Sequence, residues 1–449
     1  GVMATYDRYQ DFVIDNHRFY SALLSDEGTN EVPYEFYSVA RFQLPENNWY
    51  FDQWLMYYEV IGRAYQVIER APQVEGSEVD RLTAEAKFLA GMAYYNLLVG
   101  FGEEIAYVDG IQSTERPRRA EPGELWDLTE QMLKDAIADL PADVNIEQYG
   151  RATKAAAQVM LARVYMQQHE YELAEPLLSE VISSGKYSLN DDYEDNFVES
   201  GSVNPESVFQ FNFLHKGSSS DTDDSFYFMT LWGDDLQPTN FIKESYLSET
   251  DKDGNIDPRM NVTLFWSGSD RTFYGRNHDQ WLNQTQFPVL NKEVDTEFMK
   301  YSEQEAVADN PDPKQALEED GGTDYIYIRY ADVLLLYAET LNELGQTGDA
   351  YQYVDMVRER SNMSPLAVAH PEIGNNKELF LEQLKHERLV ELAGEGMRFY
   401  DLIRWGDYGP EMADHDPNFE TFTEGQDELW PIPTTELDLN PNLRQNPGY

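Results

Sequence analysis

Residues 325–345 read YIYIRYADVLLLYAETLNELG, and QTGDAYQYVDMVRERS carries the chain on to Ser361. From Tyr330 onward, small and apolar residues recur every three or four positions, which places them on one face of a helix. Gly345 and Gly348 interrupt the run, as expected for a turn between two helices. The stretch therefore predicts two helices that pack against each other.

The offsets within this pair are those of a tetratricopeptide repeat, in which small and large apolar residues keep fixed separations. The positions that match are Ala338, Leu341, Ala350, Val354 and Val357. The same offsets recur upstream, at Ala162, Tyr165, Ala174, Leu178 and Val181. Helical pairs of this kind bury their apolar faces by stacking on one another, so we expect a solenoid.

Amphipathic helical runs also surround these two pairs. They cover residues 54–71, 79–100, 122–140, 151–168 and 171–185, and a long last stretch covers 375–404. We therefore predict a single, mainly α-helical domain over residues 1–449. Its scaffold of tetratricopeptide-like helical hairpins spans residues 51–189 and 325–405.

Residues 190–324 interrupt the helical pattern, and Gly, Asp, Asn, Ser, Thr and aromatic residues dominate there. A run of about 130 residues without helical periodicity is much longer than an ordinary connection, so we expect a large, irregular, ligand-binding loop insertion. At the other end, the Pro-rich residues 429–449 predict an extended C-terminal strap that lies over the helices.

With 33 Lys and Arg against 83 Asp and Glu, the chain carries a formal net charge of −50. This charge repels phosphate backbones, so nucleic acid is not expected as a partner. It also suits a saline environment, where salt screens the self-repulsion. The chain has no cysteine, which excludes disulfides and thiolate metal sites. No stretch approaches the ~18 apolar residues of a membrane-spanning helix.

Three segments resemble one protein family: residues 325–345, residues 387–406 (ERLVELAGEGMRFYDLIRWG) and residues 429–449 (LWPIPTTELDLNPNLRQNPGY). They are similar, in this order, to the motifs of the SusD/RagB family of outer-membrane glycan-binding lipoproteins. Residues 85–102 agree with the family's order too. So do residues 257–259, which the family carries as an ordinary loop.

The resemblance implies a non-catalytic protein on the outer surface of the cell outer membrane. It would capture oligosaccharides or polysaccharides and deliver them to a SusC-like TonB-dependent transporter. The family's lipid-modified N-terminal cysteine is absent here, and we expect the lipid anchor to precede the first residue of this sequence. Contact with the membrane is expected only through that anchor.

A neutral sugar needs flat aromatic rings for its C–H faces and polar side chains for its hydroxyls. The resemblance implies that both come from the insertion and from the loop over residues 34–50. The candidate glycan-binding residues are Arg41, Trp49, Trp232, Trp266, Tyr274, Arg276, Asn277 and Trp281. For the tryptophans, simple loop packing stays the alternative. Because the net charge disfavours anionic glycans, we hypothesise a neutral β-glucan such as laminarin.

Charged residues on the two motif helices would lie between hairpins, where each needs a partner of opposite charge. We expect structural ion pairs from Arg329, Asp332, Glu339, Arg388, Glu391, Arg398, Asp401 and Arg404. We expect core positions for Trp54, Trp126, Trp405 and Trp430.

Residues 249–257, ETDKDGNID, resemble the first half of a calcium-binding loop. The candidate ligands are Asp251, Asp253, Asn255 and Asp257. The bidentate Glu expected near the end is missing, since Met260 stands there, so a solvated acidic turn is the alternative. Calcium is thus a possible ligand, and no cofactor is required.

No catalytic motif is complete in this sequence. His386 and Glu387 begin like a zinc-protease helix, but the second His is missing. We therefore predict a binding protein and not an enzyme. A repeat-type adaptor that binds a protein partner on its helical face, with no sugar site, stays the alternative.

Overall fold

The computed structural model describes most of the chain. The described residues are 1–11, 13–30, 35–44, 51–111, 116–145, 148–198, 203–213, 236–272, 277–280, 296–301 and 323–449. Within them the fold is mainly helical, and the strands are short and paired in twos.

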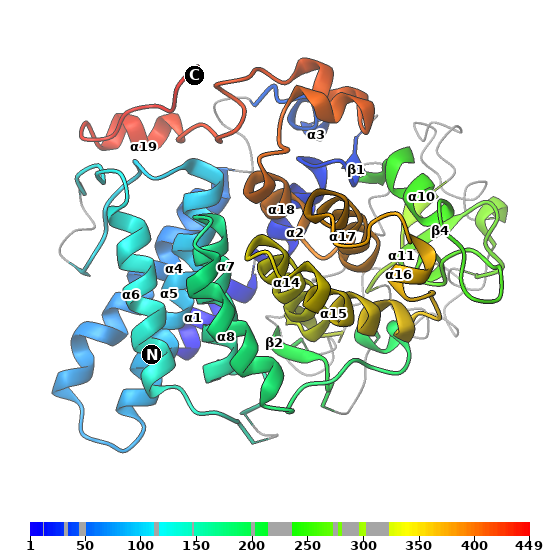
Figure 1. Ribbon diagram of the computed structural model, residues 1–449. Coiled ribbons are helices and arrows are strands. Elements are labelled where there is room, and N and C mark those ends of the chain that lie inside the picture. Colours follow the sequence, from blue (N-terminus) through cyan, green and yellow to red (C-terminus); the bar gives the residue numbers. More distant parts are fainter. Residues whose placement is uncertain are drawn as a thin grey trace.

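An array of helices forms the scaffold. Its members are α4 (Phe51–Arg70), α5 (Val79–Phe101), α6 (Glu124–Asp139), α7 (Lys154–Gln167), α8 (Tyr171–Ser183), α14 (Tyr330–Glu343) and α15 (Thr347–Arg360). Each packs against the next in this order, including α8 against α14. The array is therefore continuous in space, although residues 190–324 separate its two parts in the sequence (Figure 1). The predicted mainly helical scaffold of hairpins is confirmed.

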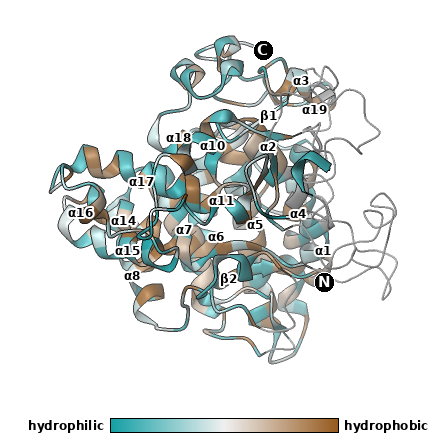
Figure 2. Cartoon of the chain, turned by 90° about the vertical axis from the view of Figure 1, so that its right-hand side faces the viewer, coloured by the Kyte–Doolittle hydropathy of each residue, from teal (hydrophilic) through white to brown (hydrophobic). Residues whose placement is uncertain are grey.

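The ends and faces of these helices follow the sequence. Thr153 caps α7, since its hydroxyl accepts a hydrogen bond from the N–H of Ala156. Helix α5 ends at Gly102, whose φ of +86° favours glycine. Figure 2 shows hydrophobic and hydrophilic segments alternating along the helices, as expected when one face of each is buried.

The predicted long helix over residues 375–404 is wrong in one respect. The structure has two helices there, α17 (Lys377–Leu392) and α18 (Arg398–Trp405). Gly394 and Gly396 separate them with φ values of +74° and +82°, a left-handed backbone that ends a helix. Periodicity continues across the break because both helices bury apolar faces in the same core.

Further elements precede the array: α1 (Met3–Asp11), α2 (Val13–Leu23), β1 (Gly28–Thr29) and α3 (Glu35–Val39). Helices α1 and α2 pack against α4. On α5, the Asn96 amide donates a hydrogen bond of 2.8 Å to the Tyr9 hydroxyl. The helical part of the fold thus begins before residue 51, where the sequence-based boundary was placed. A short 3-10 helix, η1 (Ala71–Gln73), ends α4.

The described part of the insertion holds short elements. They are η4 (Tyr193–Asn196), β2 (Ser207–Phe211), β3 (Gln237–Pro238), α10 (Asn240–Leu247), α11 (Met260–Thr263), β4 (Leu264–Trp266) and β5 (Thr296–Phe298). Strand β2 pairs antiparallel with β6 (Tyr325–Arg329), which runs directly into α14. The two ends of the insertion therefore meet at the β2–β6 pair.

The C-terminal part contains α16 (Leu366–Ala369), η5 (Pro410–Asp414), η6 (Pro417–Thr421) and α19 (Thr434–Leu439). Trp430 packs on Gly100, whose carbonyl accepts a hydrogen bond from the backbone N–H of Trp430 at 2.7 Å. The Asn446 amide donates to the carbonyl of Phe101 at 2.9 Å. The segment lies over the end of α5, but the predicted strap is not extended throughout, because residues 434–439 are helical.

Buried ion pairs join the helices, and the predicted structural role of the charged motif residues is confirmed. Each of them is buried and paired: Arg329 with Glu206, Glu391 and Glu395; Arg388 with Asp332 and Asp401; Arg398 with Asp26; Arg404 with Glu339 and Asp401. Such pairs add little net stability, but removal of one partner leaves an uncompensated charge in the interior. Trp54, Trp126 and Trp430 are buried as expected, and Trp405 is half-buried.

Glu27 is a buried acid with no ion-pair partner of its own among the described residues. It lies beside the Asp26–Arg398 pair, and within the described residues its Oε1 has no hydrogen-bond donor. Burial raises the pKa of Glu27 from 4.5 to about 8, because loss of hydration outweighs the attraction of Arg398. Glu27 is therefore protonated in the native protein at neutral pH.

We expect this group to lower stability as the pH rises. Between pH about 5 and about 8 the unfolded chain ionises Glu27 while the native state keeps the proton, so unfolding becomes more favourable. The variant Glu27→Gln removes this slope. Urea unfolding at pH about 5 and at pH about 8 should therefore give a higher free energy of unfolding for Glu27→Gln than for the wild type. This difference should be larger at pH about 8. An equal difference at both pH values would contradict the assignment.

Candidate functional site

The structure places three of the predicted glycan-binding residues. Arg41 follows α3, Trp266 ends β4, and Asn277 begins a short turn. The other candidates lie outside the described residues: Trp49, Trp232, Tyr274, Arg276 and Trp281.

Short strands connect the N-terminal loop with the insertion. Strand β1 pairs antiparallel with β3, β3 packs against β5, and β5 pairs with β4. In the last pair Thr296 lies opposite Trp266. Arg41 and Trp266 therefore belong to segments that one series of strands, β1–β3–β5–β4, holds together. The family resemblance implies a common site from the insertion and from residues 34–50, which follow β1.

Trp266 is half-buried at the edge of this series. Its ring packs on the backbone at Gly268, where an added methyl group would overlap the indole. Lys243 of α10 places its Nζ 5.9 Å from the ring centre. Within the described residues the indole N–H has no hydrogen-bond partner. Contacts with the Gly268 backbone and with Lys243 therefore position the ring, and its exposed part is an aromatic surface of the kind that sugar rings contact.

Two buried cations fix β4 and β5 on the scaffold. Arg259 precedes α11 and β4, and its Nη1 lies 2.6 Å from Glu387 and 3.0 Å from Glu391, both on α17. Lys300 follows β5 and contacts Glu395 at 2.7 Å. Burial lowers the pKa of Lys300 to about 8, although Glu395 acts in the opposite direction. The strand pair that carries Trp266 is thus tied to the helical scaffold on both sides.

Residues 257–259 do form a loop, as the resemblance implies, but the charged side chains of this loop are buried in ion pairs. Asp257 and Arg259 form a pair at 2.7 Å, and both side chains are buried. The sequence signal was an acid and a base two positions apart around a proline. Lys300 gave no such signal, because a single Lys in a polar segment is usually exposed.

Arg41 is engaged within its own loop. Its guanidinium lies over the Tyr37 ring, 3.5 Å from the centre, and Nη1 donates to the carbonyl of Asn30 at 2.8 Å. Thr421 of η6 donates its hydroxyl hydrogen to the Arg41 carbonyl at 2.7 Å. Arg41 therefore shapes the loop that follows β1. Its contact with a glycan stays a prediction.

Asn277 is exposed and stabilises a turn. Its side-chain oxygen accepts the N–H of Gln280 at 2.9 Å, and the Gln280 side chain accepts the N–H of Asn277 at 3.1 Å. This reciprocal pair caps the helical turn over residues 278–280.

The four predicted calcium ligands do not surround one point. Asp257 pairs with Arg259. The Asp251 carboxylate accepts the N–H groups of Asp253 and Asn255 at 2.9 Å and 2.8 Å. Over the described ranges, no group of three His, Asp or Glu side chains is arranged to hold a metal ion. Calcium at this turn stays a prediction, with Asp257 removed from the candidate ligands.

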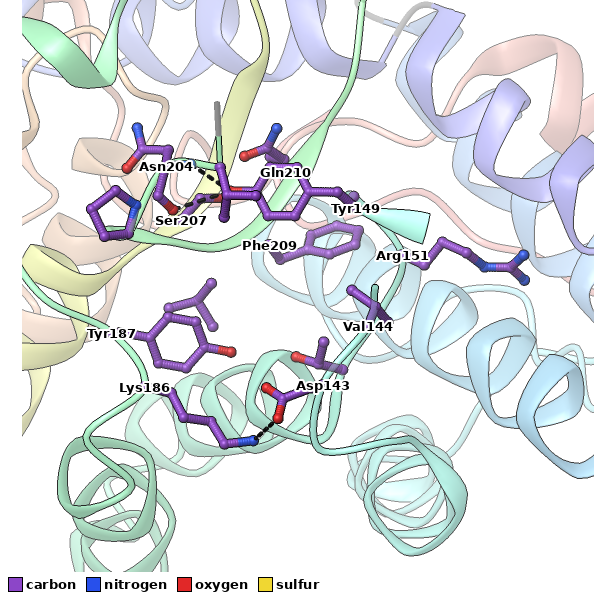
Figure 3. Close-up of a pocket in the computed structure, with 15 residues that line it drawn as sticks. Asp143, Val144, Tyr149, Arg151, Lys186, Tyr187, Asn204, Ser207, Phe209 and Gln210 are labelled. Atoms are coloured by element: carbon purple, nitrogen blue, oxygen red, sulfur yellow. Dashed lines mark hydrogen bonds and ion pairs between the residues drawn. The ribbon is translucent and has the colours of Figure 1, made fainter. Parts of the chain in front are cut away.

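A cavity of about 170 Å³ lies beside β2, away from these loops. Figure 3 shows Tyr149 and Phe209 around it and the Lys186–Asp143 ion pair near its rim. The Tyr149 hydroxyl accepts the N–H of Asn204 at 3.1 Å. Most of these polar groups are paired, but the side-chain oxygen of Gln210, which also lines the cavity, has no hydrogen-bond partner among the described residues.

Comparison with known families decides what this architecture belongs to. Residues 205–449, more than half of the chain, match the model of the SusD family. The chain belongs to the SusD family. Residues 2–166 match a second SusD-like model, described as starch-binding and associating with the outer membrane. Proteins of the SusD family are non-catalytic glycan-binding proteins associated with the outer membrane, so the prediction of a binding protein and not an enzyme is confirmed.

SusD relatives span the whole chain. It is 27% identical to SusD-like protein P2 of Formosa agariphila, over 95% of this chain and 85% of that protein. It is similar in fold to a SusD superfamily protein from Bacteroides vulgatus, with a TM-score of 0.84, 23% identity and coverage of 100% and 97%. Another similar fold is surface glycan-binding protein A of Bacteroides thetaiotaomicron in complex with laminarihexaose, with a TM-score of 0.78, 21% identity and coverage of 99% and 98%. Across the described helices of this SusD protein, none is long and apolar enough to cross a membrane.

Proposed function

We propose that this SusD-family protein captures a neutral glycan at the cell surface and delivers it to a SusC-like TonB-dependent transporter. A lipid anchor would hold it on the outer membrane. The glycan we propose is a β-glucan of the laminarin type. The arrangement of Trp266 carries the proposal, because a half-buried indole on an anchored strand pair supplies a rigid apolar surface for a sugar ring.

Charge and the loop geometry support a neutral ligand. The net charge of −50 repels uronates and sulfated sugars over the whole molecule. In the described part of the insertion, Arg271 is paired with Glu194 and Arg259 with Asp257, so these cations are already neutralised by carboxylates. A fold shared with a protein solved in complex with laminarihexaose makes a β-1,3-glucan the first glycan to test.

The test is affinity electrophoresis of the wild type and of Trp266→Ala and Trp281→Ala through gels that contain laminarin, starch, xylan, mannan, pectin or alginate. We expect laminarin to retard the wild type. We expect Trp266→Ala to weaken binding at least tenfold, which corresponds to about 1.4 kcal/mol, within the range for a lost aromatic stack.

Tyr107→Ala is the matched control. Tyr107 is also a half-buried ring with a cation over it, since Arg118 lies 3.9 Å from its centre, but it precedes α6, far along the chain from β4. This variant should bind as the wild type does. Equal binding by wild type and Trp266→Ala, with unchanged circular dichroism, would refute the role of Trp266. Retardation by a glycan other than laminarin would replace the proposed substrate.

A further inference from the structure

One C-terminal segment contacts both parts of the chain from which the glycan site is proposed. This segment, residues 408–422, contains η5 and η6 and lies beside β1 (Figure 1). It holds the loop that follows β1 through a hydrogen bond of 2.7 Å from the Asn418 amide to the Thr29 hydroxyl, and through a hydrogen bond to the Arg41 carbonyl. A third residue of the segment, His415, reaches the insertion. The segment is therefore placed to fix the two parts relative to each other.

An aromatic stack joins this segment to α10. The ring centres of His415 and Phe241 lie 3.7 Å apart, with an angle of 7° between the ring planes. Phe241 belongs to the first turn of α10, and Lys243 of the same helix lies near the Trp266 ring. Helix α10 therefore connects the His415 ring with the aromatic surface proposed to contact the glycan.

The His415 ring also contacts a buried carboxylate. Its Nδ1 lies 2.9 Å from Oδ2 of Asp26, which is fully buried. Burial opposes the ionisation of Asp26, but Arg398 and His415 outweigh it and hold the pKa of Asp26 at about 2. An ionised carboxylate only accepts hydrogen bonds, so Nδ1 of His415 carries a proton in this contact. His415 thus binds an anion of the loop before β1 and an aromatic ring of α10 at the same time.

The surroundings of His415 contain several charged groups. On the elements that pack around it they are Asp26 and Glu27 before β1, Lys243 and Glu244 on α10, Arg398 on α18, and Glu411, Asp414 and Asp416 on its own segment. Asp26 contacts the ring directly, and Arg398 contacts Asp26 at 2.6 Å. Glu27 is mostly protonated below pH about 8. Among these residue types, histidine is the one that ordinarily changes its charge between pH about 5 and 8.

A charged ring makes both contacts of His415 stronger. The neutral ring already donates a hydrogen bond to Asp26, and protonation adds the attraction between opposite charges. A cation is also attracted by the face of an aromatic ring, here that of Phe241. The start of α10 is tied to the same place by Thr239, whose hydroxyl donates to the Asp26 carbonyl at 2.6 Å. Of these ties to α10, the one through His415 depends on its proton.

We propose that His415 is a pH-sensitive positioning residue of the glycan site. Its protonated ring fastens α10 to the loop before β1, which keeps Lys243 and Trp266 in the arrangement that binds the sugar. Because proton and glycan favour the same arrangement, glycan affinity rises as the pH falls through the range in which histidine gains its charge. The effect on the glycan rests on the proposed function, whereas the hold on α10 does not.

Hydrogen–deuterium exchange of residues 240–247 without glycan tests the hold on α10. Rates are measured at pH about 5.5 and about 7.5 and are divided by the intrinsic rates at each pH. We expect the protection of the wild type to be about threefold higher at the lower pH, within the range of a partly exposed ion pair. His415→Phe keeps a ring against Phe241 and removes the titrating nitrogen, so its protection should not change with pH.

Affinity electrophoresis at the same two pH values tests the link to the glycan, in gels of the glycan that retards the wild type. The wild type should bind about threefold more tightly at the lower pH, and His415→Phe should bind equally at both. The control is His169→Asn, which removes an exposed histidine between α7 and α8. Its φ of +60° suits asparagine, and the variant should keep the pH dependence of the wild type.

Two results of the exchange measurement would overturn the proposal: equal protection of α10 at the two pH values in the wild type, or the same pH dependence in His415→Phe. An affinity of the wild type that does not change with pH would also overturn it. If no glycan retards the wild type, the proposed function fails, and the exchange rates still decide whether His415 fastens α10. All variants are first compared by thermal unfolding.

Discussion

Glu391→Gln is expected to lower the free energy of unfolding by about 3–5 kcal/mol, the range for breaking a buried ion pair. Glu391 is fully buried on α17 and accepts hydrogen bonds from Arg329 at 2.6 Å, Arg360 at 2.5 Å and Arg259 at 3.0 Å. Burial by itself would raise the pKa of Glu391, but the three arginines hold it well below its usual value. Glutamine has the same shape, but its NH₂ group would face arginine donors.

Urea unfolding followed by circular dichroism measures this loss, at one fixed salt concentration because the chain is so acidic. Glu382→Gln is the control on the same helix. Its side chain is 68% exposed and pairs with Lys385, so the change should stay within about 0.5 kcal/mol. A loss below about 1 kcal/mol for Glu391→Gln would show that other groups compensate the charges of the three arginines. The ion pairs between α17 and the insertion would then contribute less to stability than their geometry indicates.

Gly396→Ala is expected to cost about 2–4 kcal/mol, from strain and from a steric clash. Gly396 has a φ of +82°, which L side chains rarely adopt. An added Cβ would lie 2.9 Å from the His17 ring and 3.3 Å from the Arg18 Cα. The His17 ring could turn aside, but the Arg18 backbone belongs to α2 and would have to move as a unit.

Gly406→Ala separates these two contributions. Gly406 has a similar φ of +72°, but an added Cβ there meets no atom of the described residues within 4 Å. It should therefore cost only about 1 kcal/mol, the backbone part. Thermal and urea unfolding of both variants gives the difference. Equal losses at the two positions would show that α2 adjusts freely, and that the close packing of the turn after α17 on α2 contributes little.

Most of the scaffold could be predicted from the sequence, because amphipathic periodicity directly encodes which helix face is buried. It gave the array from α4 to α15 and the interruption at residue 190. The break between α17 and α18 was missed, since the glycines there end one helix without ending the apolar pattern. The packing of α8 on α14 could not be read from the sequence, because residues 184–329 separate the two helices.

The segment that carries the candidate site could be predicted from the sequence, but the residues that hold this segment on the scaffold could not. Aromatic and polar residues in the insertion marked the segment that carries Trp266. The residues that hold this segment in place, Arg259 and Lys300, were not recognised, because their partners lie on α17 and in the turn after it, about 90 to 130 positions away. Pairing over such separations depends on the fold and leaves no local pattern.

The meeting of β2 with β6 bears on how such proteins diverge. Strands β2 and β6 hold the two ends of the insertion side by side, so the segment between them is a loop closed at its base. The entropy of closing a loop grows only with the logarithm of its length, about 0.6 kcal/mol for each doubling. Insertions, deletions and exchanges within it are therefore nearly neutral for folding. Selection can replace the recognition loops for a new polysaccharide while the helices, and whatever binds to them, stay unchanged.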